Sequence, residues 1–132
     1  IRESGNRKSF ETGVKMIEGA QSLGYLYMMP YWFSVLGDAC ISQGLLKEGH
    51  YCLDQAMKII DESNEHWHLP EIYRLYGELA EKELSNNELE AHEWYTKAIL
   101  LAKKQKAKNW ELRATESLNS LKTSIESYQS SD

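Results

Sequence analysis

The same spacing of a proline and a glycine occurs twice along the 132-residue chain, forty positions apart. The stretches PYWFSVLGDACISQG (30–44) and PEIYRLYGELAEKEL (70–84) each carry a proline seven residues ahead of a glycine. Proline is favoured at the first position of a helix, and a glycine within a helix lets a neighbouring helix approach closely. The repetition therefore predicts two helical hairpins of the same design, stacked on one another.

Apolar residues recur at spacings of three and four nearly throughout the chain, and no stretch alternates like a strand for long. We expect six helices. The first covers about 8–23 and is stopped by Gly24, the second runs from Pro30 to about Gly44, and the third covers about 47–62. Pro70 opens the fourth, the SNN turn at 85–87 caps the fifth, and Asn109 caps the sixth, which runs to about Glu126 before fraying.

The fold class that follows is all-α, with stacked antiparallel helix pairs in one domain over 1–132. Its repeat units lie at about 30–69 and 70–108, with flanking helices at about 8–23 and 109–126. Small residues at matching places would set the distance between helices, and large residues beside them would fill the gaps. These positions are Leu36, Gly37, Leu53 and Ala56 in the first unit, and Tyr76, Gly77, Tyr95 and Ala98 in the second.

This pattern resembles the tetratricopeptide repeat, a helical hairpin that stacks into a right-handed superhelix. The matching residues are Phe33, Leu36, Gly37, Gly44, Gly49, Leu53 and Ala56, then Tyr73, Tyr76, Gly77, Ala91, Tyr95 and Ala98. The unit here is longer than the family's usual unit of about 34 residues. The resemblance implies a concave groove that binds a peptide or a neighbouring domain.

A narrower likeness covers most of the chain from about Glu18 onward. It is similar to the C-terminal repeat segments of bacterial class III adenylate or guanylate cyclases and of related predicted ATPases and transcriptional regulators. The matching residues are Arg74, Leu75, Gly77 and Glu78, then Glu111, Leu112, Arg113, Ala114, Ser117 and Leu118. The likeness implies a regulatory segment of a larger signalling protein, whose catalytic or DNA-binding domain it does not identify.

In the tetratricopeptide arrangement, one register of the first helix of each pair lines the groove. The predicted groove residues are Tyr31, Ser34, Asp38, Arg74, Glu78, Glu81, Glu111 and Thr115, and Ile41 is expected on the same register as Ser34 and Asp38. Such a groove is acidic with one arginine, and it would select a basic or amide-rich segment. The alternative is that Glu71, Arg74 and Glu78, spaced three and four apart, form ordinary ion pairs on a helix surface, with a bridge from Arg74 to Glu111.

Charge and cysteine usage limit the partners and the compartment. The net charge of -5 argues against nucleic acid, and the basic run KKQKAK (103–108) suits the end of a helix. The apolar run GYLYMMPYWF is broken by Pro30 and too short for a membrane span. Cys40 and Cys52 sit in helical patterns, which indicates buried thiols in a reducing, cytoplasmic setting. Because the chain opens on Ile1, we expect it to be a piece of a longer protein.

Neither metal binding nor catalysis is predicted. His66 and His68 in HWH, like His50 and Cys52, are two residues apart and point to different sides of a helix. The sequence has no phosphate-binding loop, no nucleophile elbow and no Cys-His arrangement with an orienting partner. We therefore expect no cofactor and no enzymatic activity of the segment itself.

The function that these observations favour is a non-catalytic protein-interaction or regulatory scaffold, with a protein, a peptide or an adjacent domain of the same chain as partner. A free-standing adaptor that recruits another protein is one alternative. A homo-oligomerisation module, pairing as a dimer through an edge at Tyr27, Met28 and Met29, is the other.

Overall fold

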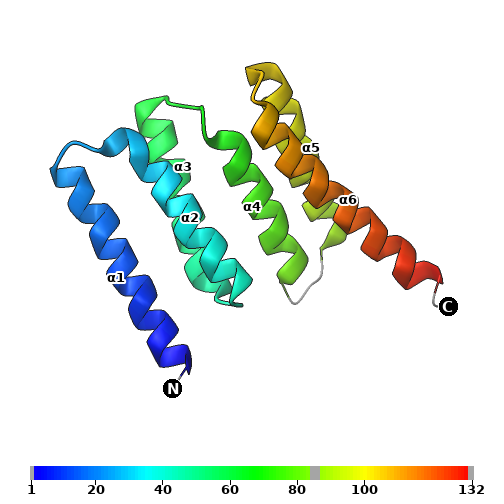
Figure 1. Ribbon diagram of the computed structural model, residues 1–132, viewed down its shortest axis with the longest axis horizontal. Coiled ribbons are helices and arrows are strands. Elements are labelled where there is room, and N and C mark those ends of the chain that lie inside the picture. The colour runs from blue at the N-terminus through cyan, green and yellow to red at the C-terminus, as the bar shows by residue number, and fades with distance from the viewer. Residues whose placement is uncertain (1, 84–86, 131–132) are drawn as a thin grey trace. The chain divides into compact units, whose positions relative to one another are not determined.

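The computed structural model describes residues 2–83 and 87–130, and the regular secondary structure within these ranges is all helix (Figure 1). The α-helices are α1 (Arg2–Ser22), α2 (Met29–Ser42), α3 (Leu46–Ser63), α4 (Leu69–Lys82), α5 (Glu88–Gln105) and α6 (Lys108–Ser130), with a 3-10 helix η1 (Leu26–Met28) ahead of α2. The described ranges contain six α-helices and no strand, which confirms the all-α class. None of these helices combines the length and the apolar character needed to cross a bilayer.

Several predicted helix ends are confirmed by their backbone geometry. Pro30 lies in the first turn of α2, where its missing N–H costs no helical hydrogen bond. Gly24 and Gly44 follow α1 and α2 with φ of 85° and 82°, a left-handed conformation that glycine adopts without strain. Asn87 caps α5, because its side chain accepts a hydrogen bond from the Glu90 backbone N–H. Ser85 and Asn86 of the predicted turn lie outside the described residues.

Three predicted boundaries are wrong. Helix α6 begins at Lys108, so Asn109 lies inside the first turn and is not its cap. Helix α5 ends just before Lys106, which has a φ of 59°, and the Ala107 N–H donates to Ala102 O. The Ala107 carbonyl then accepts the first hydrogen bond of α6, from the Glu111 N–H. Helix α6 continues to Ser130 past Glu126, and α1 begins at Arg2 instead of Lys8. Neither polar end contains a proline to stop the helix.

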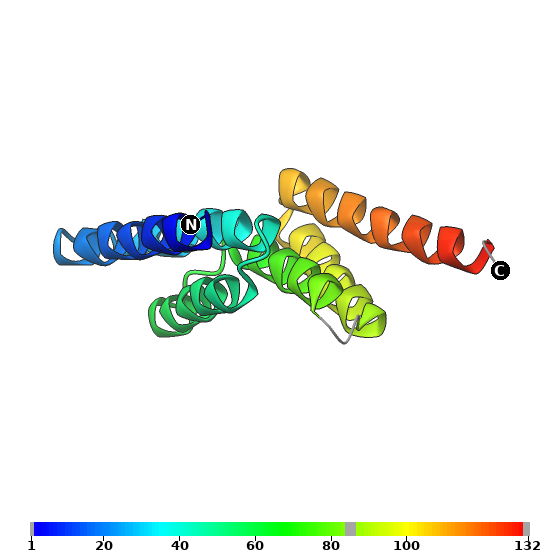
Figure 2. The ribbon, with the colours of Figure 1, turned by 90° about the horizontal axis from the view of Figure 1, so that it is seen from below.

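The chain divides into two compact units between His68 and Leu69. In the first unit, α2 packs against α3 and α1 (Figures 1 and 2). A Cβ at Gly37 would lie 3.1 Å from the Cβ of Cys52, and one at Gly49 would lie 2.8 Å from Ile41 Cγ1. These two glycines therefore let α2 and α3 approach closely. Cys40 and Cys52 are buried free thiols, as predicted.

In the second unit, α4 and α5 pair and α6 packs against both (Figure 2). Ala80, Ala91, Tyr95 and Leu121 form its core, with Leu118 and Ile125 of α6 packed against them. A Cβ at Gly77 would lie 2.5 Å from Tyr95 Cε1, so the glycine makes room for the ring. The predicted packing role of Gly77 is thus confirmed, and its partner is the tyrosine ring on α5.

The remaining predicted packing positions also lie at helix contacts. Leu53, Ala56, Tyr95 and Ala98 are fully buried. Leu36 and Tyr76 are half-buried: Leu36 lies against Gly13 of α1, and Tyr76 stacks on Trp94 with ring centroids 4.8 Å apart. The two hairpins thus share an internal register of small and large residues.

We expect Asn87→Ala to lower the free energy of unfolding by about 1 kcal/mol, because the first turn of α5 loses its side-chain cap. Asn109→Ala is the matched control, since Asn109 lies within α6 and alanine is the better helix former. Urea unfolding followed by circular dichroism measures both variants. Equal losses in the two would contradict the assignment of the caps.

Candidate functional site

The structure places the eight predicted groove residues in two different kinds of environment. Ser34 on α2 and Arg74 on α4 are buried, with 3% and 5% of their surface exposed. The remaining six are half-buried or exposed, namely Tyr31, Asp38, Glu78, Glu81, Glu111 and Thr115. Ile41, expected on the same register, is fully buried in the hydrophobic core and cannot line a groove.

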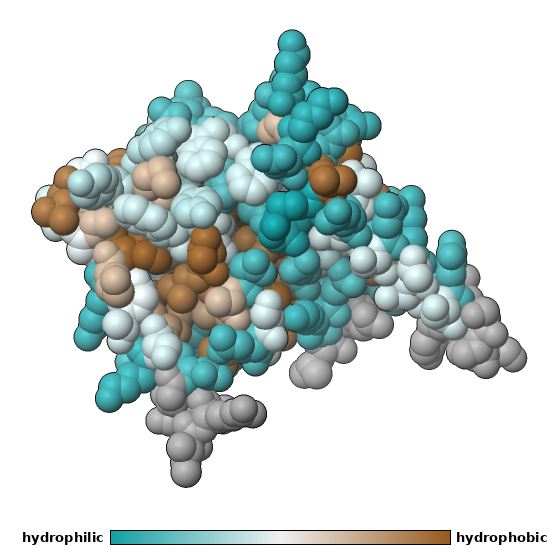
Figure 3. Space-filling view, in the orientation of Figure 1, coloured by the Kyte–Doolittle hydropathy of each residue, from teal (hydrophilic) through white to brown (hydrophobic). Residues whose placement is uncertain are grey.

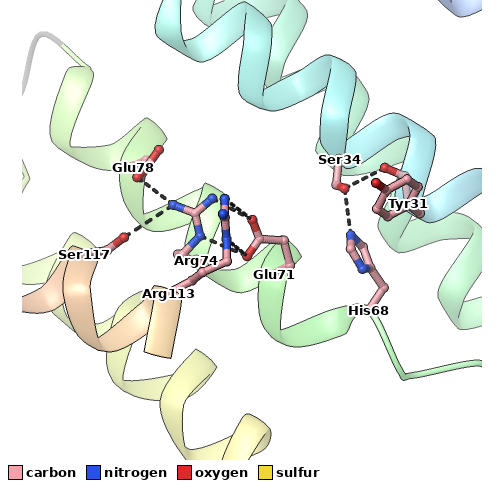
Figure 4. Close-up of polar contacts among 8 residues, drawn as sticks. All are labelled: Tyr31, Ser34, His68, Glu71, Arg74, Glu78, Arg113 and Ser117. Atoms are coloured by element: carbon pink, nitrogen blue, oxygen red, sulfur yellow. Dashed lines mark hydrogen bonds and ion pairs between the residues drawn. The ribbon is translucent and has the colours of Figure 1, made fainter. Parts of the chain in front are cut away.

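Arg74 is the centre of a buried charge network in the second unit (Figure 4). Its Nε and Nη2 donate to the two carboxylate oxygens of Glu71 at 2.9 and 2.6 Å, and its Nη1 donates to Glu78 Oε1 at 2.7 Å. Glu71 is 5% exposed. The predicted ion pairs of Arg74 with Glu71 and Glu78 are therefore confirmed, but their predicted place on the helix surface is wrong, because Arg74 and Glu71 are buried.

Helix α6 closes this network from the other side. Arg113 directs Nη2 and Nε at Glu71, at 3.1 Å from Oε1 and 3.4 Å from Oε2. Arg74 Nη1 also donates to Ser117 Oγ at 3.4 Å. Two guanidinium groups thus share one buried carboxylate, and this arrangement ties α4 to α6.

Tyr95 and Glu81 form a second polar contact in the same unit. The Tyr95 hydroxyl donates to Glu81 Oε2, which links α5 to α4. Burial raises the pKa of the Glu81 carboxyl, and the nearby Glu78 and Glu88 charges add to this effect, while the tyrosine hydroxyl opposes it. Burial and the neighbouring carboxylate also raise the pKa of the Tyr95 phenol. Glu81 is thus a carboxylate held where its charge is poorly solvated.

These two contacts border a cavity of about 540 Å³ between α4, α5 and α6. Its lining residues are Arg74, Glu78, Glu81, Lys82, Tyr95, Arg113, Glu116, Ser117 and Ser120. The cavity brings together three predicted groove residues, Arg74, Glu78 and Glu81. We refer to it below as the α4–α6 pocket.

The other residues that line the pocket lie outside the predicted groove, namely Lys82, Tyr95, Arg113, Glu116, Ser117 and Ser120. The predicted role of Tyr95 is packing, and the structure adds the contact of its hydroxyl with Glu81. Arg113 and Ser117 are four residues apart and share a helix face, which is the signal that could have identified them. The spacing does not show which helix packs against that face.

In the first unit, Ser34 Oγ lies 2.7 Å from His68 Nε2 (Figure 4). Ser34 also donates its hydroxyl proton to Tyr31 O at 2.6 Å. A serine hydroxyl has only one proton, so with that proton directed at Tyr31 O the contact requires His68 to donate from Nε2. The contact links the chain that follows α3 to α2 within the first unit.

The histidines of HWH differ in their surroundings, but the predicted helical geometry is wrong, because 66–68 lie in the connection between α3 and α4. His68 is buried, whereas His66 is exposed and its Nε2 lies 2.8 Å from Asn64 Oδ1. Within the described ranges, no three His, Cys, Asp or Glu side chains are grouped so that they could hold a metal ion.

Comparison of the chain with protein-family models, curated proteins and solved structures finds no match. The function is therefore argued from the geometry of the chain.

We expect Glu81→Gln to leave the fold intact and to raise the free energy of unfolding at neutral pH by at most about 1 kcal/mol. Glutamine keeps an acceptor for Tyr95 and removes a poorly solvated charge. Because the folded-state pKa of Glu81 is raised, its protonation stabilises the fold below the ordinary value of 4.5, and this contribution is lost as the pH rises through the raised pKa. Urea unfolding at several pH values should show the advantage of glutamine shrinking as the pH falls. A constant difference would contradict the assignment.

Proposed function

We propose that the chain is a non-catalytic protein-binding module built from tetratricopeptide-like helical hairpins, which stack as a superhelical fragment. Its partner is a peptide or a neighbouring domain, held by side chains of the first helix in a pair. The α4–α6 pocket is the binding site that the contacts support best.

The observation that carries this proposal is the repeated register of the two hairpins. Gly37 and Gly77 are both buried at helix contacts. On the second helices, four buried positions recur at an offset of forty-two residues: Gly49, Leu53, Ala56 and Ile60 in α3, and Ala91, Tyr95, Ala98 and Ala102 in α5. Repeated hairpins that bury one face and present another are typical of binding modules, in which shape and exposed side chains select the partner.

The proposal of a regulatory role in a larger signalling protein, cyclase-like or ATPase-like, rests on the resemblance of two segments. In the second unit these segments contact each other, since Arg74 donates to Ser117 and pairs with Glu78. Arg113 of the second segment pairs with Glu71, directly ahead of the first. Four of the residues that carry the resemblance, Arg74, Glu78, Arg113 and Ser117, therefore belong to one network with Glu71, which supports treating the two segments as a unit.

Selection of displayed random peptides against the immobilised protein tests the binding function. We expect one family of sequences to be enriched and Glu116→Lys, at the exposed rim of the α4–α6 pocket, to weaken binding at least about tenfold. Glu93→Lys makes the same charge change on an exposed residue of α5 that does not line the pocket. Absence of an enriched family, or equal binding by both variants, would exclude the pocket as the binding site.

A homo-oligomerisation module is the second candidate, and the exposed apolar surface of the first unit favours it. A cavity of about 570 Å³ between α1 and α2 has no charged residue in its lining. Figure 3 shows hydrophobic surface over these helices. Met16 and Val35, which line the cavity, are 72% and 53% exposed. Contiguous apolar surface of this kind often marks an interface.

The predicted dimer edge needs one correction. Met29 is only 2% exposed, because it opens α2 inside the core, so it cannot pair with a second copy. Tyr27 remains exposed.

If the module self-associates, its mass measured by light scattering rises with protein concentration. Val35→Glu should abolish this rise, whereas Leu100→Glu, on the exposed surface of α5, should not. A constant monomer mass would exclude this candidate.

A further inference from the structure

The charges around the α4–α6 pocket do not balance. Arg74, Lys82 and Arg113 face the carboxylates of Glu78, Glu81 and Glu116, and Glu71 adds a fourth carboxylate directly behind Arg74. The pocket with its supporting shell therefore holds one more carboxylate than it holds cationic groups. The preferred occupant of such a site is a cation.

The pairing within the pocket shows which charges are already used. Arg74 is held by Glu71 and Glu78, and Arg113 is held by Glu71. Arg74 directs Nε, Nη1 and Nη2 at Glu71, Glu78 and Ser117, so an acidic ligand at Arg74 would have to break contacts that hold α4 to α6. Arg113 uses only Nε and Nη2 on Glu71, and Lys82 also lines the pocket, so this limit does not extend to these two cations.

Glu81 is in the opposite position. Its hydrogen-bond partner is the neutral hydroxyl of Tyr95. Burial and the carboxylates of Glu78 and Glu88 raise its pKa, and the Tyr95 hydroxyl and Lys82 oppose this rise. Glu78 accepts from Arg74 through Oε1 and is only partly buried, and Glu116 is exposed at the rim. A cation that entered the pocket would meet these three carboxylates.

We propose that the α4–α6 pocket binds the guanidinium group of an arginine in a partner peptide, with Glu81 and Glu78 as its acceptors and Glu116 at the rim. This inference rests on the proposed peptide-binding function and names the side chain that is recognised. Arginine fits better than lysine, because its planar donor fork can contact two carboxylates and the serine hydroxyls at once.

The first hairpin supplies an internal comparison. At an offset of forty residues, the positions of Glu71, Arg74, Glu78 and Glu81 are taken by Tyr31, Ser34, Asp38 and Ile41. Ile41 is fully buried in the hydrophobic core. The position equivalent to Glu81 is thus apolar in the first hairpin, so cation recognition belongs to the second unit alone.

Two capped pentapeptides test the proposal, one with a central arginine between glycines and one with citrulline, which has nearly the same shape without the charge. Binding is followed by backbone amide NMR shifts. We expect the arginine peptide to shift residues of the α4–α6 pocket with an affinity at least about tenfold above that of the citrulline peptide. Glu81→Gln should weaken arginine binding by about tenfold. Glu93→Gln, the same change outside the pocket, should not.

The outcomes separate this inference from the proposed function. Equal affinities for arginine and citrulline, or no effect of Glu81→Gln, would overturn cation recognition. If the arginine peptide fails while selected peptides without arginine lose binding in Glu116→Lys, the binding function stands and the inference is wrong. If a glutamate-centred pentapeptide shifts the pocket residues instead, the site prefers anions and the inference is again wrong.

Discussion

Replacement of Arg74 by methionine is expected to lower the free energy of unfolding by about 3 to 5 kcal/mol. Methionine retains an aliphatic stem of similar length but supplies no donor, so Glu71 keeps only the half-exposed Arg113 and Glu78 loses its partner. A carboxylate that is 5% exposed cannot recover this interaction from water. Urea unfolding of the second unit, followed by the fluorescence of Trp94 and Trp110 and by circular dichroism, measures the loss.

Two further variants test the cause of this loss. Arg113→Met should cost about 1 kcal/mol, because its guanidinium is 48% exposed and its removal leaves Arg74 on Glu71. The double variant Glu71→Leu with Arg74→Met should regain at least half of the loss, since it removes both buried charges together. A double variant as unstable as Arg74→Met would show that shape, and not the unpaired carboxylate, causes the damage.

Gly77→Ala is expected to lower the free energy of unfolding by about 1 to 3 kcal/mol, although alanine is the better helix former. The added methyl group would lie 2.5 and 2.7 Å from two ring carbons of Tyr95. That ring is fully buried and its hydroxyl is bonded to Glu81, so it cannot swing away without losing the contact. Thermal and urea unfolding measure the cost.

Gly19→Ala in α1 is the matched control. Nothing lies within 4 Å of a Cβ built at Gly19, so alanine should stabilise the helix by about 0.5 to 1 kcal/mol. Tyr95→Leu should rescue Gly77→Ala in part, because Leu53 is the equivalent residue over Gly37 in the first hairpin. If the two substitutions at 77 and 95 prove additive, the ring is not what the glycine accommodates.

The sequence by itself determined the helices and the spacing of the repeat. Pro30 and Gly44 marked the ends of α2, and Asn87 marked the start of α5, because capping depends on a few neighbouring residues. The buried positions of α3 and α5 followed from periodicity, since a helix presents every third or fourth residue to the same side. The start of α6 was misplaced by one residue, because Ala107 gives no capping signal.

Only the tertiary structure decided the role of the charged residues. The spacing of Glu71, Arg74 and Glu78 describes an exposed ion pair and a buried network equally well, since both need residues three and four apart. The difference is made by α6, which places Arg113 and Ser117 against that face. The α4–α6 pocket exists for the same reason, since Arg113, Glu116, Ser117 and Ser120 of α6 line it. Burial depends on which helix covers a face, and no local pattern in a sequence specifies that cover.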